Sequence, residues 1–199
     1  MTSERRTADD YAVVAIASSA GGIHGLTVVL GGLGPDLPVP VLVVQHLDPH
    51  HRTVIADVLS RRTTLPVKLA EHGEPALPGH CYVAPPDRHL LIAADGTLAL
   101  SDRELIHFLR PSADLLFESI AGTYGTRALV CVLTGAGNDG ASGVQAVKSC
   151  HGTVIVQNPA TAEFKGMPES AVGTGAVDFV LPLEEIATVV RNLVKTKRH

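Results

Sequence analysis

The fold is decided by the stretch YAVVAIASSAGGIHGL, which occupies residues 11–26. Its first six residues are apolar and include several β-branched side chains, a pattern that predicts a buried strand over 11–16. The small residues at 18–22 predict a tight turn, and a helix is expected from about residue 23 to about residue 33. A buried strand that passes through a small-residue turn into a helix is the first half of a βαβ unit.

The same alternation of strand and helix continues along the chain. A second buried strand is predicted over 39–45, followed by a loop at 46–51 and a helix from about 52 to 61. Farther along, the pattern predicts a helix over 112–124, a helix ending near 149, a final helix, and strands over 128–133, 153–157 and 176–181. This order predicts an α/β fold with a doubly wound, mostly parallel sheet and helices on both faces.

The middle of the chain has a different pattern, with short strand candidates at 66–70, 81–84, 90–93 and 98–101. Asp95-Gly96 lies between the last two and is typical of a hairpin turn. The whole stretch, with this short antiparallel hairpin insert, is expected to decorate the sheet and to form no core of its own. The sequence contains no linker-like composition and no internal repeat. We therefore predict a mobile polar segment at 1–10 and one domain over 11–199.

The composition argues against several classes of protein. The 199 residues are 45% hydrophobic and 18% charged, which is typical of a globular domain. A formal charge of -4 argues against nucleic acid or an anionic membrane as the main partner, and no apolar run reaches the ~20 residues that span a bilayer. Residues 1–10 lack the apolar centre of a secretory signal, so a cytoplasmic protein is expected.

The cysteines give no sign of a disulfide framework or a zinc site. Cys81, Cys131 and Cys150 are widely spaced and odd in number. The histidines also lack a spacing typical of metal ligands. The sequence therefore predicts no metal and no cofactor.

Three polar residues follow three of the predicted strands. Ser19 follows the first strand, His46 follows the second, and Asp139 lies in the turn after the strand over 128–133. Since the carboxyl ends of parallel strands meet at one edge of a sheet, a hydroxyl, an imidazole and a carboxylate are expected along that edge. They are the side chains of a Ser-His-Asp triad, which is defined by roles and geometry and not by chain order.

Each side chain has a distinct role in this interpretation. Ser19 is the candidate nucleophile, His46 is the base that takes its proton, and Asp139 is the carboxylate that orients the imidazole. Backbone N–H groups at Ala20 and Ala136 are candidates to face the developing oxyanion.

The same residues also allow interpretations in which they have only structural roles. A serine at 18 or 19, just before a helix, is typical of an N-cap. Asp139 is equally able to cap the helix that follows it, and His46 alone also fits a polar strand end.

A rival site is the segment Gly135-Ala136-Gly137-Asn138-Asp139-Gly140, which reads GxGxxG between a predicted strand and a helix. This is the context of a dinucleotide-binding fingerprint. The following strand ends in Gln157-Asn158, however, with no acidic residue for the ribose, and too few residues follow for a second nucleotide-binding half. Dinucleotide binding is therefore the less favoured alternative.

Several segments match one known family in the same order along the chain. They are the turn at 16–22, Val44-Gln45-His46-Leu47, the stretches at 77–85 and 89–90, the segment at 110–117, the turn at 133–140, and Gly166-Met167-Pro168. Together they resemble the catalytic domain of the CheB family of protein-glutamate methylesterases, from about residue 12 to about residue 190.

The resemblance implies a carboxylic-ester hydrolase of chemotaxis signal transduction, which removes methyl groups from glutamate γ-methyl esters on chemoreceptor helices. Some members also deamidate glutamine. By the same comparison, Ser19 matches the nucleophile, His46 the base and Asp139 the orienting carboxylate, while Arg110 and Met167 are expected near the cleft. The resemblance implies no cofactor.

The chain also departs from the family pattern. Ala17 replaces the usual Gly, Ala20 the usual Thr and Ala136 the usual Met. The missing hydroxyl at Ala20 leaves open an alternative, a catalytically degenerate binding module of the same fold. Chemotaxis members commonly carry an N-terminal receiver domain, whereas ten polar residues precede the first strand here, so a separate receiver protein is the expected regulator.

Overall fold

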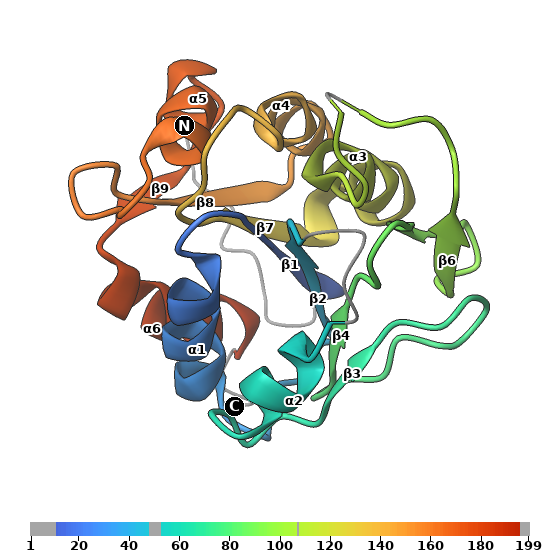
Figure 1. The fold of residues 1–199 in the computed structure, drawn as a ribbon. Helices are drawn as coiled ribbons and strands as arrows, with labels where there is room; N and C mark the ends of the chain where they lie inside the picture. The colour runs from blue at the N-terminus through green and yellow to red at the C-terminus, as the bar shows by residue number, and fades with distance from the viewer. Residues whose placement is uncertain (1–10, 48–52, 107, 196–199) are drawn as a thin grey trace.

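The computed structural model describes residues 11–47, 53–106 and 108–195. Its central sheet has seven strands, in the order β3-β4-β2-β1-β7-β8-β9 (Figure 1). Its strands are β1 (Val13–Ser18), β2 (Val41–Gln45), β3 (Val67–Leu69), β4 (Cys81–Val83), β7 (Ala128–Val132), β8 (Thr153–Gln157) and β9 (Phe179–Leu181). Every neighbouring pair in this order is parallel. The predicted doubly wound parallel sheet is confirmed.

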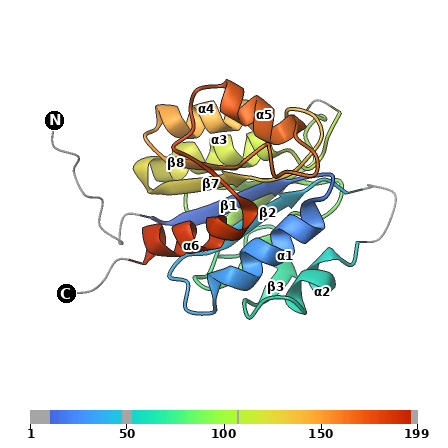
Figure 2. The ribbon, with the colours of Figure 1, turned by 90° about the vertical axis from the view of Figure 1, so that its left-hand side faces the viewer.

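Helices cover both faces of this sheet (Figure 2). One face carries α3 (Ala113–Tyr124), α4 (Ala141–Ser149) and α5 (Gly166–Gly173), and the other carries α1 (Gly22–Leu33), α2 (Ile55–Ser60) and α6 (Leu183–Val194). A 3-10 turn, η2 (Gly125–Arg127), joins α3 to β7. Within β1, Val14 and Ile16 enter the core on the α1 side, whereas Val13, Ala15 and Ala17 enter the core on the α3 side. Because both faces are covered, the strand is apolar at successive positions instead of alternating.

The order of the strands changes direction between β1 and β7. From β1 the chain proceeds through β2 to β3, at the edge of the sheet, and to β4, which lies between β3 and β2, and it then returns to β7 on the other side of β1. Loops after β1 and β7 therefore lead to opposite halves of the sheet, which opens a crevice at the carboxyl ends of these strands. Ser19 follows β1 and Asp139 lies in the loop after β7, so both residues lie at this switch point.

The short strands in the middle of the chain differ from the prediction in one respect. The strands expected at 66–70 and 81–84 do not decorate the sheet: β3 and β4 pair in parallel, and β4 pairs with β2, so they belong to the sheet itself. The reason is that β4 is apolar at each position and buried on both faces. The predicted hairpin is confirmed, since β5 (His89–Ile92) and β6 (Leu98–Ser101) are antiparallel and Gly96 adopts a φ of 85° in the turn.

Some expectations fall outside the described residues. These are the mobile segment at 1–10 and residues 48–51 of the predicted loop. The helix expected from 52 to 61 is described from Ile55 to Ser60. Across the described ranges, no helix combines the length and the apolar character needed to cross a bilayer.

Candidate active site

The backbone places Ser19 and His46 next to each other at the carboxyl ends of β1 and β2. Ser18 is the register partner of Gln45, and the N–H group of His46 donates to the carbonyl of Ser18 at 3.1 Å. On the other side, the N–H group of Ser19 donates to the carbonyl of Thr134, also at 3.1 Å, at the start of the loop after β7. The three strand ends that the sequence singled out therefore meet at one place on the sheet edge.

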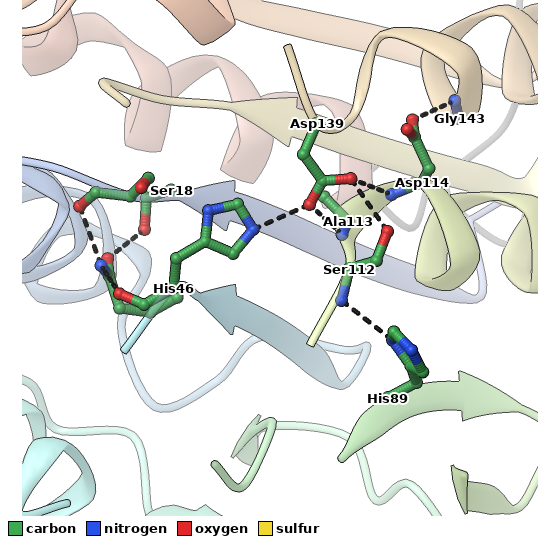
Figure 3. A network of polar contacts seen from close by, with 10 residues as sticks. Ser18, His46, His89, Ser112, Ala113, Asp114, Asp139 and Gly143 are labelled. Atoms are coloured by element: carbon green, nitrogen blue, oxygen red, sulfur yellow. Dashed lines mark hydrogen bonds and ion pairs between the residues drawn. The ribbon is translucent and has the colours of Figure 1, made fainter. Parts of the chain in front are cut away.

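His46 and Asp139 form the central polar contact of this region. The Nε2 atom of His46 lies 2.7 Å from Oδ2 of Asp139, and the two side chains are 9% and 0% exposed (Figure 3). An ionised carboxylate only accepts hydrogen bonds, so Nε2 carries the proton and Nδ1 carries the lone pair of a neutral imidazole. Between the described residues Ser19 and His46, no hydrogen bond joins the hydroxyl to the imidazole, and their relative position is set by the backbone and its neighbours.

The carboxylate of Asp139 is also bound by donors at the start of α3. Its Oδ1 accepts from Ser112 Oγ at 2.9 Å and from the Asp114 N–H at 3.1 Å, and its Oδ2 accepts from the Ala113 N–H at 2.6 Å. A helix N-terminus favours a negative charge because its N–H groups lack partners in the helix and its dipole is positive there. Burial acts to raise the pKa of Asp139, but the hydrogen bonds from His46, Ala113 and Asp114 outweigh it and hold the pKa below its ordinary value.

The capping interpretations of the same residues are wrong. The N-cap of α1 is Gly21, at a φ of 72°, so neither serine of the preceding turn takes that position. Asp139 binds the start of α3 and not the start of α4, the helix that follows it. The start of α4 is bound by Asp114 of α3, whose Oδ1 accepts from the Gly143 N–H at 2.7 Å.

Sequence reasoning missed Gln45, the buried residue before His46. Its Nε2 donates to the carbonyl of Ser19 at 2.8 Å and to that of His46 at 2.9 Å, and its Oε1 accepts from Ser18 Oγ at 2.6 Å. A polar side chain at the end of an otherwise apolar strand was the available signal, because buried polar groups need hydrogen-bond partners.

His89 was also missed as a site residue: the stretch at 89–90 matches the family, but no spacing pattern relates His89 to the other candidate residues. It is fully buried in β5, and its Nδ1 accepts from the Ser112 N–H at 3.1 Å (Figure 3). Its Nε2 donates to the carbonyl of Glu104, also at 3.1 Å. Burial lowers the pKa of His89. A neutral His89 therefore supports Ser112, and Ser112 in turn holds Asp139.

Gly135 lies beside Ser19, at a position with no room for a side chain. A Cβ atom at this residue would lie 2.3 Å from Met167 Sδ and 2.9 Å from Ser19 Cβ. Met167 is buried, and its N–H group donates to the carbonyl of Gly135 at 2.9 Å. The structure thus places Met167 beside the candidate site, as a buried residue that packs against the loop after β7.

Arg110 lies in the wall of a cavity of about 330 Å³ that His46 also lines. Its Nε and Nη2 atoms donate to Oδ1 of Asp87 at 2.8 and 2.6 Å. Its Nη1 atom donates to the carbonyls of Asp102 and Arg103 at 2.8 and 2.9 Å. These bonds tie the loop before α3 to Asp87, so Arg110 shapes the cavity beside the imidazole.

Within the part of the chain that the structure describes, the backbone N–H groups of Ala20 and Ala136 donate no hydrogen bond. Ala20 follows Ser19 directly, and its carbonyl accepts from Thr134 Oγ1 at 3.1 Å. Ala136 is exposed in the loop after β7. Unpaired N–H groups close to a nucleophile are the donors that an oxyanion needs.

The surroundings of the loop at 135–140 disfavour dinucleotide binding. Gly137 and Gly140 adopt φ angles of 84° and 98°, as a tight turn requires. A pyrophosphate would bind N–H groups at the start of α4, where the side chain of Asp114 already accepts from Gly143. Among the described residues, no group of three or more His, Cys, Asp or Glu side chains could hold a metal ion.

Cys81 and Cys131 are core residues within β4 and β7. Burial raises the pKa of Cys81 to about 12 and also raises the pKa of Cys131. Because the thiolate is the reactive form of cysteine, these two thiols are poor nucleophiles.

Known proteins resemble this chain in sequence. The family model described as CheB methylesterase matches residues 14–190. Protein-glutamate methylesterase/protein-glutamine glutaminase 2 of Anaeromyxobacter dehalogenans (strain 2CP-C) is 41% identical over 183 residues, which are 92% of this chain and 53% of that protein. A relative from Leptospira interrogans is 39% identical over 178 residues, which are 89% of this chain and 92% of that protein. The chain thus spans about half the length of the first relative and most of the second.

A solved structure resembles the chain as well. The crystal structure of the Thermotoga maritima CheB methylesterase catalytic domain matches with a TM-score of 0.88 and 35% sequence identity. The match covers 92% of this chain and 98% of that one.

Proposed function

Because this chain belongs to the CheB methylesterase family, we propose that it is a serine hydrolase that removes methyl groups from glutamate γ-methyl esters of proteins, with deamidation of glutamine as a second reaction. The observation that carries the proposal is the buried hydrogen bond between His46 and Asp139 beside Ser19. The names of the Anaeromyxobacter relative and of the Thermotoga domain support the same reaction.

In the first half of the reaction, Ser19 Oγ attacks the ester carbonyl carbon while Nδ1 of His46 takes the hydroxyl proton. Nδ1 has this role because Nε2 is bonded to Asp139. The tetrahedral intermediate then loses its methoxy group, which takes the proton back from the imidazolium and departs as methanol. The glutamyl group remains on Ser19 as an ester.

In the second half, His46 takes a proton from a water molecule whose oxygen adds to the acyl carbon. The bond to Ser19 breaks, the serine oxygen regains a proton from the imidazolium, and the product leaves as the carboxylic acid, which gives its proton to water and becomes the glutamate carboxylate. Glutamine follows the same route with ammonia as the leaving group.

Asp139 supports both halves of the reaction as a carboxylate. Its pKa lies below the ordinary value, so it is ionised at neutral pH. Its charge stabilises the imidazolium that forms whenever His46 holds the additional proton, and its position fixes the tautomer of the imidazole.

The N–H groups of Ala20 and Ala136 are the candidates for the oxyanion site. A backbone N–H donates whatever the side chain is, so alanine at these two positions leaves the donors in place. Compared with the threonine that is usual in the family, Ala20 lacks a hydroxyl beside the nucleophile.

We infer that the substrate is a methylated, chemoreceptor-like helix and that the reaction takes place in the cytoplasm. Family membership supports these assignments. The Anaeromyxobacter relative has nearly as much sequence outside the matched region as within it.

A second candidate function is a binding module of the same fold without turnover. Two observations favour it: Ala20 lacks a hydroxyl, and the described residues Ser19 and His46 are not hydrogen-bonded to each other through their side chains. In that case the chain binds the receptor-like helix, and binding persists in Ser19→Ala.

The test of the proposed function is methanol release from a methylated chemoreceptor fragment. Ser19→Ala and His46→Ala should abolish release, whereas Ser149→Ala, an exposed serine of α4, should release methanol at the parental rate. Unchanged release in Ser19→Ala would exclude the proposed mechanism. Binding of the fragment without release by any variant, the parent included, would support the binding module.

A further inference from the structure

We propose that Gln45 is a positioning residue that fixes the nucleophile and the base of the proposed reaction relative to each other. This inference rests on the proposed function. Gln45 is the last residue of β2, directly before His46, and it is 4% exposed. It acts through the backbone of Ser19 and His46.

One amide nitrogen joins the two residues. The Nε2 atom of Gln45 donates one hydrogen to the carbonyl of Ser19 at 2.8 Å and the other to the carbonyl of His46 at 2.9 Å. The two carbonyls belong to loops that follow different strands, β1 and β2. The amide therefore connects these loops at the residues that carry the hydroxyl and the imidazole.

The orientation of the amide is fixed by its other end. Ser18 Oγ donates to Oε1 of Gln45 at 2.6 Å. Of the two ends of the amide, only the nitrogen can donate to the two carbonyls, so the oxygen and nitrogen cannot exchange places. Gly22 provides the space for this arrangement, because a Cβ there would lie 2.1 Å from Oε1 of Gln45.

This connection bears on the reaction because no hydrogen bond between the described side chains of Ser19 and His46 holds them together. Besides the Gln45 amide, the bond from the His46 N–H to the Ser18 carbonyl connects the described residues at the ends of β1 and β2. Removing the amide leaves two carbonyls without this donor and frees the loops to move apart. A displacement of about 1 Å at a reacting group can lower the rate by about 100-fold.

A purely structural role for Gln45 predicts a different result, namely a loss of stability with no change in turnover. The matched control is Tyr11→Phe. It removes a buried hydrogen bond between Tyr11 Oη and Thr153 Oγ1, 2.8 Å long, at the amino ends of β1 and β8 and away from the candidate site.

The decisive variant is Gln45→Glu, which retains an oxygen for Ser18 and loses the two amide hydrogens. We compare the parent, Gln45→Glu and Tyr11→Phe by kcat and KM for methanol release from a methylated chemoreceptor fragment. We also measure the rate at which a fluorophosphonate modifies Ser19, and the Tm. The expected result for Gln45→Glu is a kcat lower by about 100-fold, a parental KM and an equally slower modification of Ser19. Tyr11→Phe should lower the Tm and leave kcat unchanged.

If folded Gln45→Glu has the kcat and the Ser19 modification rate of the parent, the inference about Gln45 is overturned and the proposed function is unaffected. A parent that neither releases methanol nor reacts with the fluorophosphonate would overturn the proposed function, and the inference with it. If Gln45→Glu does not fold, Ser18→Ala replaces it, because this variant keeps the amide and removes only the hydroxyl that orients it. Its kcat should fall about tenfold, and a parental kcat in this variant would equally overturn the inference.

Discussion

The Oδ1 atom of Asp139, a residue that precedes α4, accepts the Asp114 N–H of α3 at 3.1 Å, while Asp114 in turn accepts the Gly143 N–H of α4 at 2.7 Å (Figure 3). The carboxylate of Asp139 therefore binds the start of α3, to which Asp114 belongs. The carboxylate of Asp114 binds the start of α4, the helix that follows Asp139. The carboxylate that binds His46 is thus held by the packing of two helices and not by its own loop alone. This arrangement explains why Asp139 is both buried and ionised.

Asp139→Asn should lower kcat for methanol release by about four orders of magnitude. An asparagine amide that donates to Nε2 of His46 would place the imidazole proton on Nδ1, the atom that must accept the proton of Ser19. Steady-state kinetics measure the loss, with Asp95→Asn in the exposed hairpin turn as the control that keeps parental kcat. A parental kcat in Asp139→Asn would contradict the assigned role.

Asp139 should also contribute stability that acid removes. Its folded-state pKa lies below the ordinary value of 3.8, so the unfolded chain takes up the proton first as the pH falls. The contribution is present above pH 3.8 and is lost as the pH falls through the folded-state pKa. The difference in unfolding free energy between the parent and Asp139→Asn should therefore shrink from neutral pH towards acid, as measured by urea unfolding. A constant difference would contradict this.

Asp114 should have the opposite dependence on pH. Burial raises its pKa, and the charge of Asp139 raises it further, so the folded state retains the proton to a higher pH than the unfolded chain. Stability therefore falls as the pH rises from 3.8 through the folded-state pKa. Asp114→Asn, which keeps an oxygen for the Gly143 N–H, should gain stability relative to the parent at neutral pH and lose this gain towards pH 3.8. Urea unfolding at both pH values measures it, and a variant that is less stable only at neutral pH would refute it.

Gly135→Ala should lower both stability and activity. Its Cβ would overlap Met167 Sδ and press on Ser19 Cβ, and overpacking of this kind costs about 1–3 kcal/mol. Gly122→Ala is the matched control, since Gly122 lies within α3 with nothing within 4 Å of an added Cβ, and alanine there should stabilise the helix by about 1 kcal/mol. Thermal unfolding and kcat measure both variants. Equal effects of the two substitutions would show that crowding at Gly135 does not matter.

The parallel sheet with helices on both faces could be predicted because buried parallel strands are apolar runs that the sequence displays, as at 11–16 and 39–45. The place of Ser19, His46 and Asp139 followed from the rule that ligands bind at the carboxyl ends of such strands. The membership of β3 and β4 in the sheet could not be predicted, because strands of three residues carry too little pattern to show what they pair with.

The surroundings of the site depend on contacts between distant parts of the chain. Gln45 reaches the carbonyl of a residue 26 positions earlier, and Asp139 accepts from N–H groups some 25 positions earlier in α3. No local spacing marks such pairs. The crowding at Gly135 is likewise visible only once Met167 of α5 packs against the loop after β7.

The most direct test of the central claim is the mass-spectrometric identification of the residue that a fluorophosphonate modifies. In the parent, one adduct should form on the peptide that contains Ser19, and it should be absent from His46→Ala, because the hydroxyl is a weak nucleophile without its base. An adduct on another residue, or equal modification of Ser19 in His46→Ala, would contradict the account.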